Sequence, residues 1–369
     1  MPVIPTRRLD QLTITRFLAA MVVVQQHYGP VAGLFAQPSW ALFATAGQTA
    51  VGWFYTLSGF ILATVHADLQ PNAAFRFWWA RFARIYPSFI VALIAYGWVL
   101  SATPWRFPVA WLLNLSALQA WSPDHVYDLN VVGWSISVEA AMYALFPAII
   151  RLTQRWQAKR IWAAALGLWL VTQTAQRALA AGVVPHDWQY FINLLVYLPP
   201  WHLNAFVLGV AAAVTVRRRL RPIPVLTGAA LLAGGVLAVF VTRRWLEPML
   251  PGRAGFEHDD WVGLLAPAFA AIMAGATSID LPPLRLRVLR LLGEASFAMY
   301  IFQQSVATVC ERHGITDPAM FGTLIASCIA IHLGFEQPMR KWLRQIGPNP
   351  TTTPLLHEVT LQPTVSTPR

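Results

Sequence analysis

Long apolar runs alternate with short polar loops along almost the whole chain. A helix needs roughly 20 apolar residues to cross the hydrocarbon core of a bilayer, and many of these runs approach that length. The pattern predicts an all-α polytopic membrane protein with about ten transmembrane helices and no soluble domain. Their expected bounds are residues 12–31, 45–65, 87–102, 131–150, 161–180, 189–216, 224–242, 262–279, 291–310 and 319–335.

Prolines modify this picture at three places. Segment 108–121 is apolar but only about half as long as a span, so we expect a re-entrant or interfacial segment there. Pro199 and Pro200 lack a backbone N–H and should break the helix expected over 189–216. Pro87 suits the first turn of the helix expected over 87–102.

Charged residues indicate how the helices are oriented. With these crossings, most of the 27 Lys and Arg residues fall on one side, which the positive-inside rule assigns to the cytoplasm. Both termini are therefore expected to be cytoplasmic, with an acidic outer loop between the helices expected over 224–242 and 262–279. We expect residues 1–346 to form a single transmembrane domain. The Pro- and Thr-rich tail, 347–369, is expected to be disordered and cytoplasmic.

Composition supports a membrane protein and excludes other classes. Of the 369 residues, 56% are hydrophobic and only 12% are charged, whereas soluble proteins carry about 25% charged residues. The net charge of +11 follows the alternate loops, so it does not indicate a nucleic-acid partner. Cys310 and Cys328 lie in or beside apolar segments, so we expect neither a disulfide framework nor a metal site.

The first apolar run contains an arginine and a histidine. Arg16 and His27 are eleven positions apart, close to three helical turns, so they share one helix face roughly 16 Å apart. Ionisable groups inside an apolar segment are costly and commonly face a functional cavity. A histidine that extends its polar end to the outer interface would explain position 27 equally well. The run by itself leaves both interpretations open.

Glu139 is the one carboxylate well inside an expected crossing. An ionised carboxylate in hydrocarbon is costly, so Glu139 should face a partner or water. We favour a functional role over a purely structural carboxyl that is hydrogen-bonded to a neighbouring helix. Counted by helical rise, His27, Glu139 and Gln303 lie at nearly one depth in the outer half of the bilayer, as a common site requires.

Arg81 and Arg84 lie at the cytoplasmic start of the helix expected over 87–102. Residues three apart on a helix project to one side, and a helix N-terminus adds partial positive charge. This combination suits a ligand that carries phosphate. On local evidence alone, ordinary positive-inside anchoring is the simpler explanation.

Taken together, five stretches resemble the membrane acyltransferase-3 family, which O-acylates bacterial envelope and exported glycans. In chain order, they are the run ending at His27; Gly47–Phe60; Arg81-x-x-Arg84-Ile-Tyr-Pro87; Trp134-Ser135-x-Ser137-Val-Glu139 through Tyr143-x-Leu-Phe-Pro147; and Leu292-Gly-x-x-Ser296-Phe-x-x-Tyr300. A closing Glu336-x-Pro338-x-Arg340 is similar to the end of the family. The resemblance runs from residue 12 to about 344, essentially the whole domain.

The resemblance implies a donor and a set of site residues. The donor would be acyl-CoA, by default acetyl-CoA, which is a substrate and not a permanently bound cofactor. The family's histidine and glutamate fall on His27 and Glu139 as catalytic residues. Its paired arginines fall on Arg81 and Arg84, with Arg16 as a further donor-binding residue. The supporting residues would be Ser58, Trp134, Ser135, Ser137, Tyr143, Tyr300 and Gln303.

Two departures from the family affect these expectations. The family often has histidine where this chain has Gln303. Near Gly209 it often has an arginine and a glutamate, and this chain has neither there. Neither position is therefore assumed to be essential.

We expect an O-acyltransferase of the bacterial cytoplasmic (inner) membrane that acts on a hydroxyl of an exopolysaccharide, an O-antigen or a lipid-linked glycan. The arginines would hold the CoA phosphates at the inner mouth. His27 would act as general base with Glu139 orienting its imidazole, and a covalent acyl-histidine is the alternative route. The expected partners are acyl-CoA, the glycan or lipid-linked sugar acceptor, membrane lipids and other polysaccharide-assembly proteins.

Two other functions stay open at this point. A secondary transporter or glycan exporter gains weak support from the broken helix over 189–216, but the chain has no repeated half. An acyltransferase acting on a small molecule, such as a macrolide sugar, would use the same residues.

Overall fold

The structure is a computed structural model that describes residues 6–29, 45–99, 101–182, 188–219, 221–246, 262–316 and 318–348. Within these ranges the backbone forms α-helices, short 3₁₀ and π turns and connecting loops, with no strand. The all-helical part of the prediction is confirmed. The acidic outer loop and nearly all of the C-terminal tail, for which the sequence predicts disorder, lie outside the described residues.

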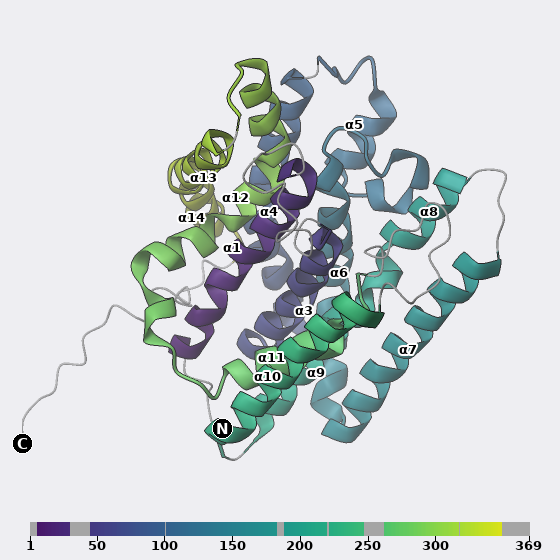
Figure 1. Cartoon of the computed structure of the whole chain (residues 1–369), viewed down its shortest axis with the longest axis vertical. Coiled ribbons are helices and arrows are strands. Elements are labelled where there is room, and N and C mark those ends of the chain that lie inside the picture. Colours follow the sequence, from purple (N-terminus) through teal and green to yellow (C-terminus); the bar gives the residue numbers. More distant parts are fainter. Residues whose placement is uncertain are drawn as a thin grey trace, which may run out of the picture.

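The long helices follow the predicted order (Figure 1). They are α1 (Thr6–Tyr28), α3 (Gly47–Val65), α4 (Ala74–Val99), α6 (Trp134–Arg155), α7 (Ala158–Gly182), α9 (Leu203–Arg218), α10 (Val225–Val241), α11 (Ala266–Ala276), α12 (Arg287–Arg312) and α13 (Ala319–Ile331). Shorter helices are α5 (Pro108–Leu115), α8 (Trp188–Tyr197) and α14 (Gln337–Gln345). The 3₁₀ turns are η3 (Pro71–Ala73), η4 (Gln119–Trp121), η5 (Pro123–His125), η6 (Val131–Gly133), η7 (Pro199–His202) and η10 (Pro282–Arg285); the π turns are η8 (Thr242–Leu246) and η11 (His332–Glu336).

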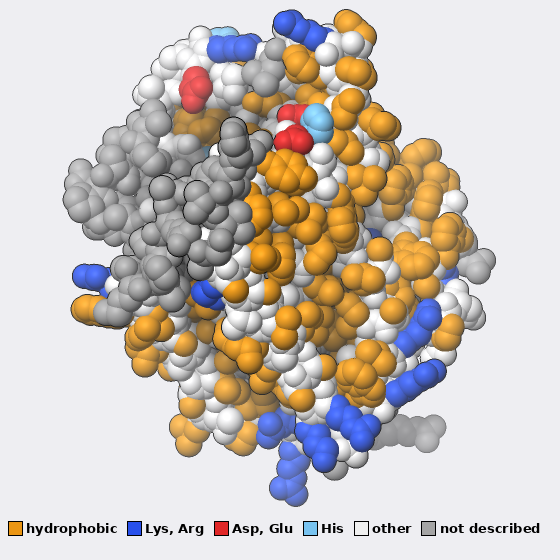
Figure 2. All heavy atoms as spheres, turned by 90° about the vertical axis from the view of Figure 1, so that its right-hand side faces the viewer, with side chains coloured by type: hydrophobic (Ala, Val, Ile, Leu, Met, Phe, Trp, Pro, Cys, Tyr) orange, Lys and Arg blue, Asp and Glu red, His pale blue; other side chains and the backbone are white. Residues whose placement is uncertain are grey.

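Five helical segments in the described part of the chain are long and apolar enough to cross a membrane. They are Pro71–Val99, Val131–Arg155, Pro199–Arg218, Val225–Leu246 and Ala319–Gln345. Figure 2 shows hydrophobic side chains covering much of one face, with most of that face's Lys and Arg side chains in its lower part. This surface is typical of a membrane protein. The count of ten crossings and the cytoplasmic placement of both termini stay predictions.

The structure contains both the short segment over 108–121 and the break at Pro199 and Pro200 that the sequence predicted. Segment 108–121 contains only the eight-residue helix α5 and the turn η4, which agrees with a segment too short to cross. The chain between α8 and α9 leaves the α-helix at Leu198 and forms the 3₁₀ turn η7 at Pro199 and Pro200. The predicted helix over 189–216 is therefore broken where the two prolines lie.

The prediction that Pro87 begins a helix was wrong. Helix α4 starts at Ala74 and continues through Pro87, although an internal proline removes a backbone hydrogen bond. Tertiary contacts stabilise the additional turns. Phe77 is buried and stacks on Phe146 with ring centroids 4.9 Å apart, and Trp79 Nε1 donates to the carbonyl oxygen of Leu343 at 2.8 Å. Arg81 and Arg84 consequently lie in the middle of a long helix.

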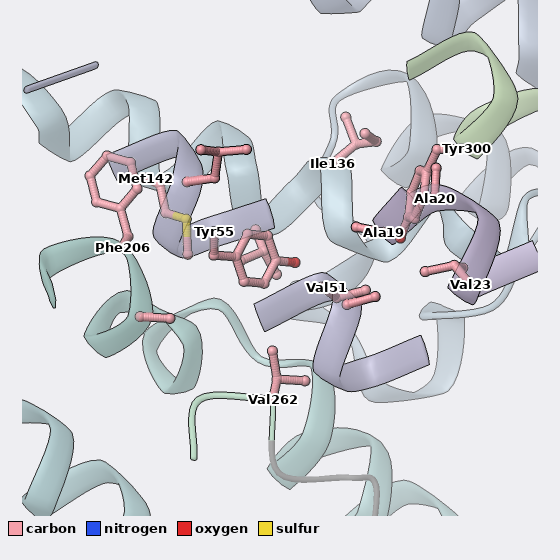
Figure 3. Packing of buried hydrophobic residues seen from close by; sticks show 14 of the residues in the cluster. Ala19, Ala20, Val23, Val51, Tyr55, Ile136, Met142, Phe206, Val262 and Tyr300 are labelled. Atoms are coloured by element: carbon pink, nitrogen blue, oxygen red, sulfur yellow. The ribbon is translucent and has the colours of Figure 1, made fainter. Parts of the chain in front are cut away.

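The core forms where helices pack in pairs, some of them neighbours in the sequence and some far apart. Helix α3 packs on α9, α1 on α12 and on α3, α10 on α11, and α12 on α13. Figure 3 shows part of this core, with side chains such as Ala19 of α1, Val51 of α3, Met142 of α6, Phe206 of α9 and Tyr300 of α12. The crossing of α1, α3, α6 and α12 is important for function because these helices surround the main polar cavity.

Two glycines allow α3 and α9 to approach closely. A Cβ atom on Gly59 would collide with the carbonyl oxygen of Phe206, and a Cβ atom on Gly209 would collide with the carbonyl oxygen of Thr56. Small residues at such crossings let helix backbones pack against each other, as is common in membrane proteins. This contact gives Gly209 a structural role.

Candidate active site

A cavity of about 190 Å³ lies among helices from both ends of the chain. Its apolar walls come mainly from α3, and its polar groups come from seven elements: α1, α3, α4, α6, α12, η11 and α14. The ionisable and hydroxyl-bearing residues that line it are Thr13, Arg16, Tyr55, Ser58, Arg81, Arg84, Ser135, Glu139, Tyr143, Glu294, Ser296, Tyr300, His332, Glu336 and Arg340. Ionisable side chains gathered around one cavity in a membrane protein indicate a functional site.

The three arginines predicted to hold the donor line this one cavity. Arg81 and Arg84 reach it from adjacent turns of α4, and Arg16 reaches it from α1. The guanidinium of Arg81 lies 5.8 Å from the centroid of the Phe77 ring. Its Nε atom is buried without a hydrogen-bond partner, so an incoming ligand with acceptor oxygens has a donor available.

Glu139 enters the same cavity from α6 and is half-buried. One turn along this helix, the hydroxyl of Tyr143 donates to Oε1 of Glu139. Ser58 of α3 lies on the other side, with its Oγ atom 3.4 Å from the Tyr143 hydroxyl oxygen. The position of Tyr143 is set by α4, because Trp78 Nε1 donates to the Tyr143 carbonyl oxygen at 3.0 Å. These contacts place a carboxylate and two hydroxyls beside the arginines.

Two further predicted residues line the cavity, and two do not. Ser135 and Tyr300 lie in its wall. Trp134 instead packs against Tyr197 and His202, with ring centroids 4.7 Å and 5.6 Å away. Ser137 is buried outside the cavity lining. Trp134 and Ser137 therefore support the fold of α6 around the cavity and do not line it.

His27 pairs with Gln303. The Nδ1 atom of His27 lies 3.0 Å from Oε1 of Gln303, and Gln303 Nε2 donates to the Tyr300 carbonyl oxygen at 2.7 Å. The expected contact between His27 and Glu139 was wrong, since no hydrogen bond joins them in the described structure and His27 does not line the cavity that Glu139 lines. Helical rise predicts the depth of a residue, but how helices rotate against each other decides which residues meet.

Sequence reasoning gave no role to four ionisable residues that line the cavity. These are Glu294 of α12, His332 and Glu336 of η11, and Arg340 of α14. His332 Nδ1 lies 3.0 Å from Oε2 of Glu336, and His332 Nε2 lies 3.6 Å from Oε2 of Glu294. The available signals were an ionisable residue near the end of each of two apolar runs, at positions 294 and 332, and the closing motif that contains Glu336 and Arg340. Among the described residues, no group of three or more His, Cys, Asp or Glu side chains is arranged to hold a metal ion.

His66 lies just beyond the end of α3, near the predicted inner surface. Its ring packs edge-on against Phe77, with centroids 5.3 Å apart. Burial, together with the nearby charges of Arg81 and Arg344, lowers the pKa of His66 to about 4. This side chain is therefore uncharged at neutral pH.

Two comparisons with known proteins identify the family of this chain. A family model described as an acyltransferase domain, acyltransferase-3, matches residues 9–335. The chain is also similar to the acyltransferase MdmB of Streptomyces mycarofaciens, with 30% identity over 317 residues that cover 80% of this chain and 78% of that protein. No solved structure matches the chain. The match extends over nearly the whole helical domain, so the chain belongs to the acyltransferase-3 family and is an acyltransferase.

Proposed function

We propose that the protein is an integral membrane O-acyltransferase that takes an acyl group, by default acetyl, from cytoplasmic acyl-CoA. The acceptor is a hydroxyl of an exopolysaccharide, an O-antigen or a lipid-linked glycan. The observation that carries the proposal is the convergence of Arg16, Arg81 and Arg84 on one cavity that also contains Glu139 and Tyr143. Several arginines close together suit a ligand with several phosphate groups, and the phosphates of CoA fit this requirement.

The transfer itself requires a base. The acceptor oxygen attacks the thioester carbonyl carbon, a C–O bond forms, the C–S bond breaks, and CoA leaves as the thiol after the hydroxyl proton has been transferred. An alcohol is a poor nucleophile at neutral pH, so a base positioned to take its proton accelerates the reaction. His27 is the proposed base.

Gln303 supports this role for His27. The Gln303 amide donates through Nε2 to the Tyr300 carbonyl oxygen, so its Oε1 atom is the acceptor toward His27. The imidazole then carries its proton on Nδ1, and Nε2 has the free lone pair that a general base needs. The Tyr300 side chain lines the cavity, and Gln303, which contacts His27, lies three residues further along α12. One turn of α12 therefore connects the cavity to the histidine.

Glu139 takes a different role from the one the sequence predicted. Its carboxylate accepts from Tyr143 and lines the same cavity as the arginines. We assign Glu139 and Tyr143 to the path of the acyl-pantetheine arm, where the carboxylate offsets the positive charge of the arginines and the hydroxyls contact the donor.

The test is transfer of labelled acetyl from acetyl-CoA by the purified full-length protein. The acceptors offered are an isolated exopolysaccharide, an O-antigen, a lipid-linked glycan and a glycosylated macrolide. Arg81→Ala combined with Arg84→Ala should abolish transfer and CoA binding while thermal melting stays near wild type. Arg76→Ala is the matched control, because Arg76 is an exposed cation on the same helix outside the cavity lining.

Three results would contradict the proposal in whole or in part. Wild-type transfer by the folded double variant would remove the arginines from donor binding. Absence of acetyl-CoA turnover with every hydroxyl acceptor would reject acyl-CoA as the donor. Transfer to the macrolide alone would change the acceptor class to a small molecule.

A further inference from the structure

A π-helical turn, η11, joins α13 to α14 beside the cavity. Such turns insert an extra residue into a helix and are found frequently at functional sites. Here the first and last residues of the turn, His332 and Glu336, both line the cavity. Their side chains are only 1% and 4% exposed. The irregular backbone therefore brings two buried ionisable groups to one wall of the site.

The imidazole of His332 connects this turn to the helix opposite. Its Nδ1 atom lies 3.0 Å from Glu336 Oε2, and its Nε2 atom lies 2.9 Å from Gln337 Nε2 and 3.6 Å from Glu294 Oε2. Glu294 belongs to α12 and also lies 3.7 Å from Arg290 Nε. A buried polar group with partners on each side holds its neighbours in a defined arrangement. These contacts fix the turn and the start of α14 relative to α12.

Arg340 lies one helical turn after Glu336 and lines the cavity. Its Nε atom is buried and has no hydrogen-bond partner in the described structure, and the same is true of Arg81 Nε. Unpaired buried donors are unfavourable unless a ligand supplies acceptors. Helix α14 packs on α4, which carries Arg81 and Arg84. Two helices thus present arginines with unpaired donors to one cavity.

We propose that Arg340 binds a phosphate group of the donor together with Arg81 and Arg84, and that His332, Glu336 and Glu294 are positioning residues that hold the start of α14 in place. This inference rests on the proposed function and extends the donor site to the C-terminal helix. The ligand class is a phosphate-bearing thioester, and CoA is the probe.

The experiment measures the Kd for CoA by calorimetry, and the KM and kcat for acetyl-CoA, on the full-length protein. Arg340→Ala should weaken CoA binding by about 10- to 100-fold, the usual range for a charge-assisted hydrogen bond, and should act mainly on KM. Arg340→Lys should recover part of the affinity, since lysine keeps the charge and loses the planar fork. Lys341→Ala is the matched control: it removes an exposed cation next to Arg340, and affinity should stay unchanged.

The positioning role has a separate readout. His332→Asn should weaken CoA binding less than Arg340→Ala does. The double variant should bind no more weakly than Arg340→Ala alone, because residues that act through one group are non-additive. Multiplicative losses would show that His332 does not act through Arg340. Should Arg340→Ala fail to fold, as judged by thermal melting, Arg340→Gln carries the test, because it removes the charge and keeps a long polar side chain. Wild-type CoA affinity in that folded variant would overturn this inference.

The outcomes separate this inference from the proposed function. CoA binding that is lost in Arg81→Ala and unchanged in Arg340→Ala would overturn this inference and leave the proposed function intact. A fall in kcat with unchanged Kd and KM in Arg340→Ala would also overturn it. A wild-type protein that neither binds CoA nor uses acetyl-CoA would overturn both.

Discussion

Gln303 makes two hydrogen bonds that together decide how His27 is presented. It donates to the Tyr300 carbonyl oxygen and accepts from His27 Nδ1. An imidazole held through Nδ1 keeps its Nε2 lone pair available, which is the requirement for a general base. The Gln303 amide thus orients the imidazole here, as a carboxylate does in other acid–base pairs.

The first prediction concerns this pair. His27→Ala should lower single-turnover acetyl transfer by about 10²- to 10⁴-fold, the usual contribution of general-base catalysis, while CoA binding stays unchanged. Gln303→Ala should cause a smaller loss, roughly 2- to 10-fold, because only the orienting hydrogen bond is removed. The double variant should match His27→Ala.

Gln304→Ala is the control for the Gln303 substitution. The side chain of this neighbouring amide accepts from the Val131 backbone N–H and donates to the Tyr96 hydroxyl, and it makes no hydrogen bond to His27 in the described structure. Its transfer rate should stay near wild type in protein that remains folded. Near-normal transfer by His27→Ala would instead leave the histidine as an interfacial side chain.

The second prediction concerns pH. The pKa of His66 is lowered to about 4 in the folded protein, and the ordinary histidine value is about 6.5. Below the ordinary value the unfolded chain binds a proton that the folded protein does not bind, so stability should fall as the pH decreases from 6.5 toward 4. His66→Asn should reduce this dependence in thermal melting. His313→Asn, which changes an exposed histidine, should keep it, and equal profiles for all three proteins would exclude the effect.

At the scale of the helix, close approach decides which substitutions the fold tolerates. The α3–α9 crossing depends on Gly59 and Gly209, each of which faces a backbone carbonyl of the other helix. Gly234 of α10 has open space around its Cα atom instead. The same substitution should therefore have opposite effects at positions 209 and 234.

The third prediction uses this contrast. Gly209→Ala should destabilise the protein by about 1–3 kcal/mol, the usual cost of overpacking, because the added methyl group meets the Thr56 carbonyl. Gly234→Ala should stabilise it by about 0.5–1 kcal/mol through helix propensity alone. Thermal melting in detergent measures both. A melting temperature that rises in Gly209→Ala would show that the crossing is looser than the structure indicates.

At the scale of the whole molecule, many exposed side chains are apolar, which suits a surface in contact with lipid and not with water. Trp98, Trp105 and Leu226 are more than four-fifths exposed, at 82%, 83% and 86%. Contiguous exposed apolar surface is unfavourable in water and is favourable in a bilayer. Trp98 and Trp105 flank the chain that leads from α4 into α5, where aromatic residues suit the membrane interface.

The fourth prediction tests the topology around this segment. If residues 108–121 do not cross the membrane, Trp105→Cys and Asp128→Cys should both react with an impermeant thiol reagent added outside intact cells. Lys159→Cys is the inner control and should react only after permeabilisation. The native Cys310 and Cys328 are both buried, so background labelling should be low. Labelling of positions 105 and 128 from opposite sides would show that residues 108–121 cross the membrane. The helices that follow would then have the opposite orientation to the one predicted.

The sequence by itself determined the helical class, the order of the helices, the break at Pro199 and the short segment at 108–121. Run length, proline chemistry and helical period are local properties, and they are sufficient for these features. Arg16 and Glu139 were also found in this way, because charge inside an apolar run is conspicuous. The donor-binding role of Arg81 and Arg84 came instead from the family resemblance.

Only the tertiary structure decided which of these residues share a cavity. Helical period gives the face on which a residue lies, but packing sets how each helix rotates and tilts against the others. That packing pairs His27 with Gln303 and brings His332, Glu336 and Arg340 to the arginines of α4, more than 200 positions earlier in the chain. The extra residue in the π turn shifts the helix faces locally, and a regular period does not predict such a shift.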